Sequence, residues 1–277
     1  KFAILKYKRS QYFILLGKTK GWNSGFFCLN DYKREIRNKK MQFSDFKTPK
    51  ELKDYLEKPF HHTRKSVFHY TNLNALVQIF NGKKLKASMF EKTNDILEED
   101  FLIEEVKQKK FMCFMKTRTD NYGMWAMYGG LKKEKGENPK LEDFCVKIEF
   151  PVDMLKKFIK NHNLKANLIA YTDLHSERKI YFCGTVTNSK KINLDKELLS
   201  GYVKDVIWKN EEELRIWFNN DFEEIDDEFL SSLKIIPNPL YTVEDYKKIL
   251  RQNNVSEELI NKMNFEKNKY YNTYRPK

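Results

Sequence analysis

The amino-acid sequence predicts an α+β protein: a small three-stranded sheet with two helices, followed by a larger mixed α/β domain. Three observations favour this class and its division into two parts. The 277 residues are 40% hydrophobic and 14% aromatic, which is enough to bury a core in one large domain or two smaller ones. Strand-like and helix-like patterns alternate along the chain. Positive charge is concentrated in residues 1–60, with 15 Lys and Arg against 6 Asp and Glu, whereas the whole chain has a net charge of +13.

The N-terminal segment has the predicted order strand, strand, helix, strand, helix, at 11–17, 26–29, 30–38, 41–46 and 48–58. Glycines between the first two strands predict a hairpin. In the last helix Thr48 is the expected N-cap and Pro49 the first helical residue. The stretch "EKPFHHTRKS", residues 57–66, reads as a linker. The predicted domains are therefore 1–58 and 66–277.

Three motifs mark this segment: "YFILLG", Gly25-Phe26-Phe27 and "FSDFKTPKELKDYL". Together they resemble the hybrid-binding domain of eukaryotic-type ribonuclease H, also found in caulimovirus inclusion proteins. The resemblance implies binding of double-stranded RNA or RNA/DNA hybrids through backbone contacts. Ser44 and Asp45 replace the usual lysine pair, and the usual tryptophan after the glycine is missing. Substitute contacts are expected from Lys18, Lys20, Trp22, Lys33, Arg34 and Arg37. The alternatives are a solvated basic face and a protein-docking module.

The second segment opens with "VFHYT", a predicted strand that places His69 and Tyr70 at a strand-to-helix junction. The following helix has an apolar stripe and ends at Gly82, with Thr71 as its expected N-cap. "KFMCFMK" is predicted as a buried strand and "FCVKIEF" as an alternating one. Trp125 and Tyr128 are three residues apart, so on a helix they share a face that either lines a pocket or fills the core.

The segment "EEELRIWF", residues 211–218, alternates like a strand. Its apolar residues would face the core, and the opposite face would carry Glu211, Glu213, Arg215 and Trp217. Two carboxylates beside a guanidinium and an indole are either a chemically active face or a salt-bridge ladder on the surface.

Four motifs follow one another along the chain: His69-Tyr70-Thr71, Asn94-Asp95 with Glu98, Trp125 with Tyr128, and Trp208 with Glu211, Glu213 and Arg215. From about residue 66 to 260 the chain resembles a bacterial domain family of unknown function, with Ile96 and Met115 departing from its pattern. That family in turn resembles the ADP-ribosyltransferase fold.

The resemblance implies that NAD is a substrate. His69 would hold the nicotinamide ribose, Tyr128 or Trp125 would stack on nicotinamide, and Glu213 would bind the ribose hydroxyl. Arg215 would fix this carboxylate or meet a pyrophosphate. The expected catalytic residues are Glu213, His69 and Glu211, and the expected NAD-binding residues are His69, Tyr70, Thr71, Asn94, Trp125, Tyr128 and Arg215. The sequence has no G-x-G-x-x-G motif, which disfavours a hydride-transfer enzyme.

The expected function is ADP-ribosyl transfer to RNA or to a protein associated with nucleic acid. Such an activity suits a bacterial toxin or anti-phage effector controlled by an antitoxin or another regulator. The alternatives are a non-catalytic RNA or RNA/DNA-hybrid sensor and a metal-dependent nuclease that uses Asp95, Glu98 and Glu213. Four widely separated cysteines predict no zinc site, and the lack of a long apolar run predicts a cytoplasmic protein without membrane contact.

Overall fold

The structure is a computed structural model that describes residues 3–7, 11–15, 48–60, 65–90, 98, 102–116, 122–129, 140–172, 180–182, 185–187 and 200–271. The chain forms two compact units, one of residues 1–41 with 275–277 and one of residues 42–274. The second unit is a mixed α+β structure built on a mostly antiparallel sheet. The α+β prediction is confirmed at this level.

The first unit contains a two-stranded antiparallel hairpin. Strand β2 (Gln11–Leu15) lies within the predicted first strand, and it pairs with β1 (Ala3–Tyr7), a strand that the prediction did not include. The other two predicted strands, at 26–29 and 41–46, lie outside the described residues.

Helix α2 (Pro49–Leu56) forms as predicted, because the Thr48 side chain accepts a hydrogen bond from the Glu51 N–H at 3.2 Å and Pro49 begins the helix. Its apolar residues Leu52 and Leu56 are fully buried in the core of the second unit. The division between the units therefore lies at residues 41 and 42, upstream of the predicted boundary at 58–66.

The central sheet of the second unit has seven strands, and every pair in it is antiparallel. The strand order is β15 (Lys234–Pro237), β7 (Cys145–Pro151), β3 (Ser66–Asn72), β6 (Lys110–Met115), β13 (Glu213–Phe218) and β8 (Lys165–Leu168), with β5 (Ser88–Met89) paired to β6. Strands β3, β6 and β7 confirm the three strands predicted at these positions. Strand β7 was predicted to alternate between core and solvent. Helices cover the sheet on both sides, so β7 is instead buried on both faces.

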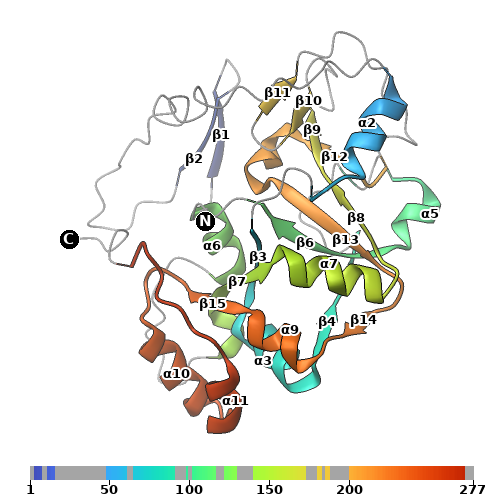
Figure 1. Cartoon of the computed structure of the whole chain (residues 1–277). Coiled ribbons are helices and arrows are strands. Elements are labelled where there is room, and N and C mark those ends of the chain that lie inside the picture. Colours follow the sequence, from blue (N-terminus) through green and yellow to red (C-terminus); the bar gives the residue numbers. More distant parts are fainter. Residues whose placement is uncertain are drawn as a thin grey trace. The chain divides into compact units, whose positions relative to one another are not determined.

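One face of this sheet carries the main core. Phe114, Ile148, Leu214 and Ile216 point to it. The helices α3 (Leu73–Gly82), α7 (Val152–Asn161), α9 (Asp227–Ser232) and α10 (Val243–Gln252) contribute buried residues to this core. Helix α7 lies in front of the sheet in Figure 1. Helix α3 begins with Asn72 as its N-cap, whose Oδ1 accepts from the Ala75 N–H at 2.8 Å, so the predicted cap at Thr71 is wrong by one residue.

The opposite face carries a smaller core under helix α6 (Tyr122–Gly129). Met124 and Trp125 of this helix pack on Phe68, Tyr70 and Met115 of the sheet. By strand alternation Cys113, Glu213 and Arg215 belong to this same face. The face is therefore apolar under α6 and charged beside it.

A second sheet flanks the start of β13. Its order is β11 (Thr185–Thr187), β10 (Ile180–Phe182), β9 (Ala170–Thr172) and β12 (Val203–Asp205). The chain passes from β8 into β9 through Ile169, whose N–H donates to the Glu213 carbonyl at 3.0 Å. Strand β12 runs parallel to β9 and places Lys204 opposite Tyr171. This connection fixes the second sheet against the first residue of β13.

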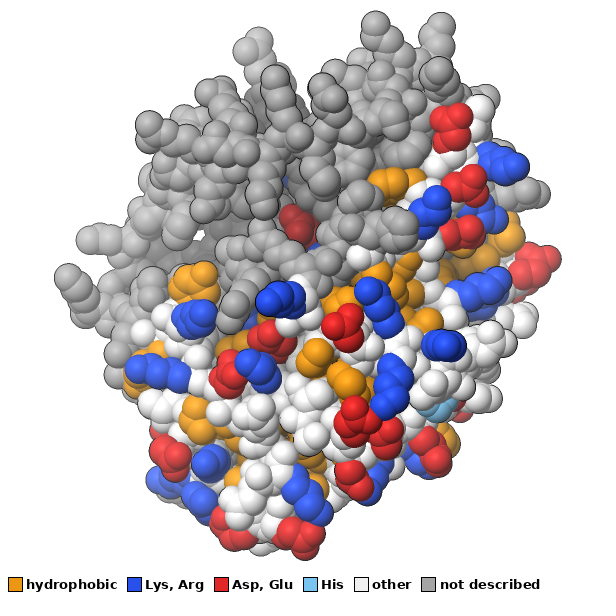
Figure 2. Space-filling model, in the orientation of Figure 1, with side chains coloured by type: hydrophobic (Ala, Val, Ile, Leu, Met, Phe, Trp, Pro, Cys, Tyr) orange, Lys and Arg blue, Asp and Glu red, His pale blue; other side chains and the backbone are white. Residues whose placement is uncertain are grey.

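The remaining elements complete the second unit: β4 (Lys84–Lys86), β14 (Phe222–Glu224), α5 (Glu104–Lys107), the 3-10 helices η2 (Leu141–Asp143) and η3 (Val206–Glu211), and α11 (Glu257–Lys262). On the face shown in Figure 2, acidic and basic side chains are interspersed. Exposed ion pairs of the second unit include Lys157–Glu228 and Lys262–Glu258. None of the helices in the described ranges is long and apolar enough to cross a bilayer.

Candidate active site

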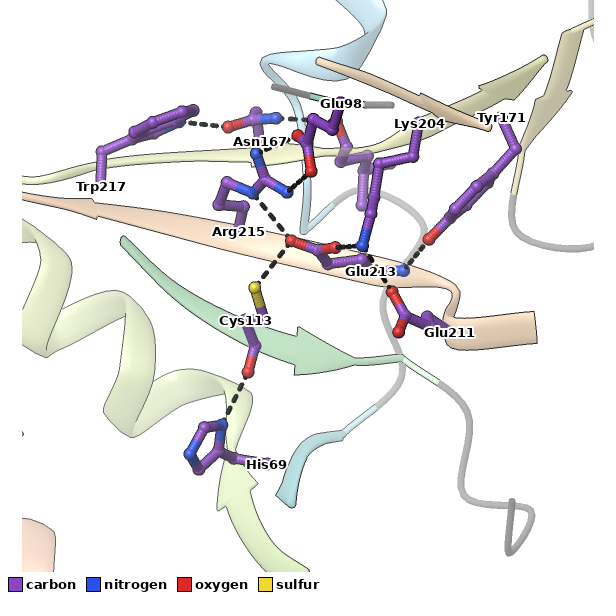
Figure 3. Close-up of polar contacts among 11 residues, drawn as sticks. His69, Glu98, Cys113, Asn167, Tyr171, Lys204, Glu211, Glu213, Arg215 and Trp217 are labelled. Carbon is purple, nitrogen blue, oxygen red and sulfur yellow. Dashed lines mark hydrogen bonds and ion pairs between the residues drawn. The ribbon is translucent and has the colours of Figure 1, made fainter. Parts of the chain in front are cut away.

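The charged face of β13 is buried. Only 2% of the Glu213 side chain and none of Arg215 is exposed. A surface salt-bridge ladder is therefore the wrong interpretation for these two residues. Burying ions costs on the order of several kcal/mol per ion, so each must be closely paired. Figure 3 shows these partners.

Arg215 lies between two carboxylates. Its Nη1 donates to Glu98 Oε1 at 2.7 Å, and its Nε donates to Glu213 Oε1 at 2.7 Å. The guanidinium also lies over the rings of Phe111 at 4.2 Å and Phe90 at 5.1 Å. These contacts pair the guanidinium with groups of the protein itself. The hydrogen bond from Nε holds the Glu213 carboxylate in place, as in one of the two roles considered for Arg215. Arg215 also separates Glu98 from Glu213, where the nuclease interpretation would place a metal ion.

Lys204 supplies the second cation and comes from β12 of the second sheet. Its Nζ lies 2.8 Å from Glu211 Oε2 and 3.2 Å from Glu213 Oε2. The ammonium also lies 5.2 Å from the centre of the Trp208 ring. The cluster thus holds the carboxylates of Glu98, Glu211 and Glu213 and the cations of Lys204 and Arg215 (Figure 3).

The two glutamates nearest Lys204 have opposite pKa shifts. Burial alone would raise the pKa of Glu213, but Arg215 and Lys204 outweigh it and lower this pKa to about 2. Burial raises the pKa of Glu211. The charge of Glu213 adds to this rise, and the charge of Lys204 opposes it. The Cys113 thiol donates to Glu213 Oε1 at 2.9 Å. Of the two, Glu213 is therefore the carboxylate that keeps its charge to lower pH, and Glu211 takes up a proton more readily.

Glu211 is not part of the strand, contrary to the alternation predicted for residues 211–218. It ends η3, and Glu212 follows in the left-handed conformation with φ of 43°. Strand β13 consequently begins at Glu213, whose N–H donates to the Tyr171 hydroxyl at 2.8 Å. The turn at Glu212 nevertheless brings both carboxylates to Lys204.

The two aromatic candidates on α6 have different environments. Trp125 is fully buried and meets Tyr70 edge to face with ring centres 4.9 Å apart, so both are core residues. Tyr128 is 39% exposed. Burial raises the pKa of its hydroxyl, and Cys113, Glu211 and Glu213 add to this rise, so the hydroxyl lies within electrostatic reach of the cluster. Of these two aromatic residues, Tyr128 is the one with a partly exposed ring.

His69 does not converge on Glu213. Burial lowers the pKa of His69, and because a carbonyl can only accept, its neutral Nδ1–H donates to the Cys113 carbonyl at 2.8 Å. Its ring lies 5.8 Å from that of Phe114. Successive side chains of a strand point to opposite faces, so Phe114 and Cys113 place His69 and Glu213 on opposite sides of β6 (Figure 3). Among the described residues, Cys113 contacts both of them, His69 through its carbonyl and Glu213 through its thiol.

The other predicted positions divide into two groups. Thr71 is the last residue but one of β3, precedes the α3 cap Asn72 and is partly buried. Asn94, Asp95 and the six nucleic-acid candidates Lys18, Lys20, Trp22, Lys33, Arg34 and Arg37 lie outside the described residues. Among the residues that are described, no group of three His, Cys, Asp or Glu side chains is arranged to hold a metal ion.

Sequence reasoning did not single out Cys113, Tyr171 or Lys204. Each lies in a strand whose local sequence carries no motif, and tertiary folding brings it to Glu213. Glu98 was noted in the N-D-x-x-E motif but without a partner. Comparisons of the chain with protein-family models, with curated proteins and with solved structures found no match.

Proposed function

We propose that the second unit is an ADP-ribosyltransferase that uses NAD as its substrate, with Glu213 as the carboxylate that faces the nicotinamide ribose. The observation that carries this proposal is the buried Glu213 at the start of β13, whose pKa is lowered by Arg215 and Lys204 and whose charge acts on the hydroxyl of the partly exposed Tyr128. Strongly perturbed carboxylates with specific charged partners are enriched at functional sites. A buried cluster of five charged side chains is costly to retain for stability alone.

The chemistry explains why such a carboxylate is useful. The bond between the ribose C1′ and the nicotinamide nitrogen breaks, and nicotinamide leaves with the electron pair. The ribose gains oxocarbenium character, and an acceptor oxygen or nitrogen bonds to C1′ and loses a proton. A carboxylate that binds a ribose hydroxyl stabilises this positive charge more in the transition state than in the ground state.

The hydrogen bonds of Glu213 leave one oxygen for this contact. Its Oε1 accepts from Arg215 and Cys113, whereas Oε2 accepts only from Lys204 among the described residues. Oε2 is therefore the atom assigned to the ribose hydroxyl. Tyr128 is assigned to the nicotinamide ring, and His69 acts indirectly by fixing the Cys113 backbone.

The test measures nicotinamide released from NAD by the full-length protein, with and without total RNA and with a cell extract as a source of protein acceptors. Glu213→Gln should lower the rate at least about 100-fold, the scale expected for removing one group that stabilises charge in the transition state. Glu223→Gln is the matched control, because Glu223 is a buried carboxylate that pairs with His162 on another part of the second unit. Folded wild-type protein that releases no nicotinamide with any acceptor would contradict the proposal.

We also propose that residues 1–60 bring the enzyme to RNA or an RNA/DNA hybrid. The support is their charge, 15 Lys and Arg against 6 Asp and Glu. Neutralising phosphates by lysine and arginine releases counterions and drives such binding.

A further inference from the structure

The second sheet holds the first residue of β13 at two points. Lys204 and Tyr171 are opposite each other on the neighbouring strands β12 and β9. The Lys204 ammonium contacts the Glu213 carboxylate at 3.2 Å, and the Tyr171 hydroxyl accepts from the Glu213 N–H at 2.8 Å. One residue thus meets the side chain of Glu213 and the other its backbone.

Lys204 has a position that no other described cation shares, because it contacts both Glu211 and Glu213. Arg215 lies on the opposite oxygen of Glu213 and pairs with Glu98 instead. The Lys204 side chain is only 8% exposed, so water screens these two contacts weakly. Without this ammonium, Glu211 and Glu213 would face each other with no cation between them.

We propose that Lys204 is a positioning residue for ADP-ribosyl transfer: its ammonium holds Glu211 and Glu213 together and aims Oε2 of Glu213 at the ribose. This role rests on the proposed function. Lys204 does not itself contact the reacting atoms, because its described contacts are the two carboxylates and the face of Trp208. It acts by fixing the geometry and the charge of Glu213.

A loss of the cation has a defined electrostatic consequence. The titratable and charged groups around Lys204 and Glu213 are Glu98, Cys113, Tyr128, Tyr171, Glu211 and Arg215. Removing one of two cations leaves three carboxylates with Arg215 alone. An opposite charge at this range commonly lowers a carboxyl pKa by about 1–3 units, so its removal raises the pKa of Glu213. If activity needs ionised Glu213, the variant loses activity on acidification at a higher pH than the wild type does.

The experiment compares the pH profiles of kcat/KM for NAD in the wild type and Lys204→Met, which keeps an unbranched side chain but removes the charge. We expect kcat to fall at least 10-fold with a smaller change in KM, and the acidic limb to move up by about one pH unit or more. Lys204→Arg, which keeps the charge, should return the limb toward its wild-type position. Should Lys204→Met fail to fold, Lys204→Gln supplies a neutral side chain that still donates hydrogen bonds.

The control is Tyr171→Phe, which removes a contact from the same sheet without changing a charge. It should lower thermal stability and leave the acidic limb in place. If the wild type is active and a folded Lys204→Met or Lys204→Gln variant has the same acidic limb, the role of Lys204 is overturned while the transferase stands. A wild type that releases no nicotinamide would instead overturn the transferase, and the positioning role with it.

Discussion

At the scale of single residues, burial distinguishes a paired arginine in the candidate site from one on the surface. Arg215 is fully buried with Glu98 and Glu213, whereas the side chain of Arg251 is 48% exposed beside Glu257. Both arginines contact a carboxylate through their guanidinium. Only for Arg215 does truncation remove a buried counter-charge that two carboxylates share, and it leaves Glu213 with Lys204 as its one described cation.

We therefore expect Arg215→Met to lower the free energy of unfolding by about 3–5 kcal/mol, the usual effect of breaking a buried pair. Arg251→Met should change it little, because solvent screens the exposed pair. Denaturant titrations followed by circular dichroism compare the two variants. Equal stability of both variants would show that Glu98 and Glu213 find other partners or become protonated without cost.

The sequence identified Glu213 and Arg215 by alternation, but it could not assign their partners. Alternation depends on neighbours along one strand, so it places side chains on a face and not in contact with a distant residue. Lys204, Cys113 and Glu98 approach through tertiary folding from separate segments. The position of His69 in its strand likewise does not reveal that its ring bonds to the backbone of β6.

At the scale of elements, the strongest predictions were those with a regular period or a cap. The apolar stripe of α3, the Thr48 cap of α2 and the apolar run of β6 are local signals, and each element formed. The start of β13 was predicted two residues early, since Glu212 adopts the left-handed conformation. A glutamate at positive φ has no distinctive local pattern, because glycine and asparagine are the residues that usually adopt it.

The entry to β12 is a second place where backbone conformation matters. Gly201 has φ of 78°, and a Cβ there would lie 2.8 Å from Cη2 of Trp217. Gly201→Ala should lower the free energy of unfolding by about 1–3 kcal/mol through strain and a clash with this indole. Because Lys204 follows three residues later, the same variant should also impair NAD cleavage.

Gly82→Ala is the matched control for this prediction. Gly82 is the last residue of α3, and an added Cβ has nothing within 4 Å. Alanine there should leave stability unchanged or raise it by up to about 1 kcal/mol. Denaturation midpoints of the two variants decide the point, and a Gly201→Ala protein as stable as the wild type would refute the close packing of this turn on β13.

At the scale of the whole molecule, the composition identified two electrostatically different parts, and the compact units divide between residues 41 and 42, upstream of the linker predicted at 57–66. The helix of residues 49–56 carries the charge pattern of a surface helix, and only its two core leucines reveal that it packs with the second unit. The imbalance itself is plain in the sequence: residues 1–60 hold most of the net charge of +13. The remainder of the chain mixes both signs, as on the face in Figure 2.

This asymmetry leads to a prediction about binding by the whole chain. Replacing Lys33, Arg34 and Arg37 with glutamine should weaken binding to an RNA/DNA hybrid and reduce the salt dependence of the affinity. Each lost phosphate contact should lower the slope of log affinity against log salt by about 0.7–0.9, so the triple variant should lose about 2–3. Fluorescence anisotropy of a labelled hybrid between about 50 and 200 mM salt measures both quantities.

The control variant replaces three exposed lysines of the second unit, Lys248, Lys267 and Lys269, with glutamine. Its net charge changes by the same amount, so a general loss of attraction would affect both variants equally. A slope reduced only by the N-terminal substitutions would assign the phosphate contacts to residues 1–60. Equal slopes in the two variants would mean that the hybrid responds to net charge alone, and the N-terminal residues would then have no specific part in nucleic-acid binding.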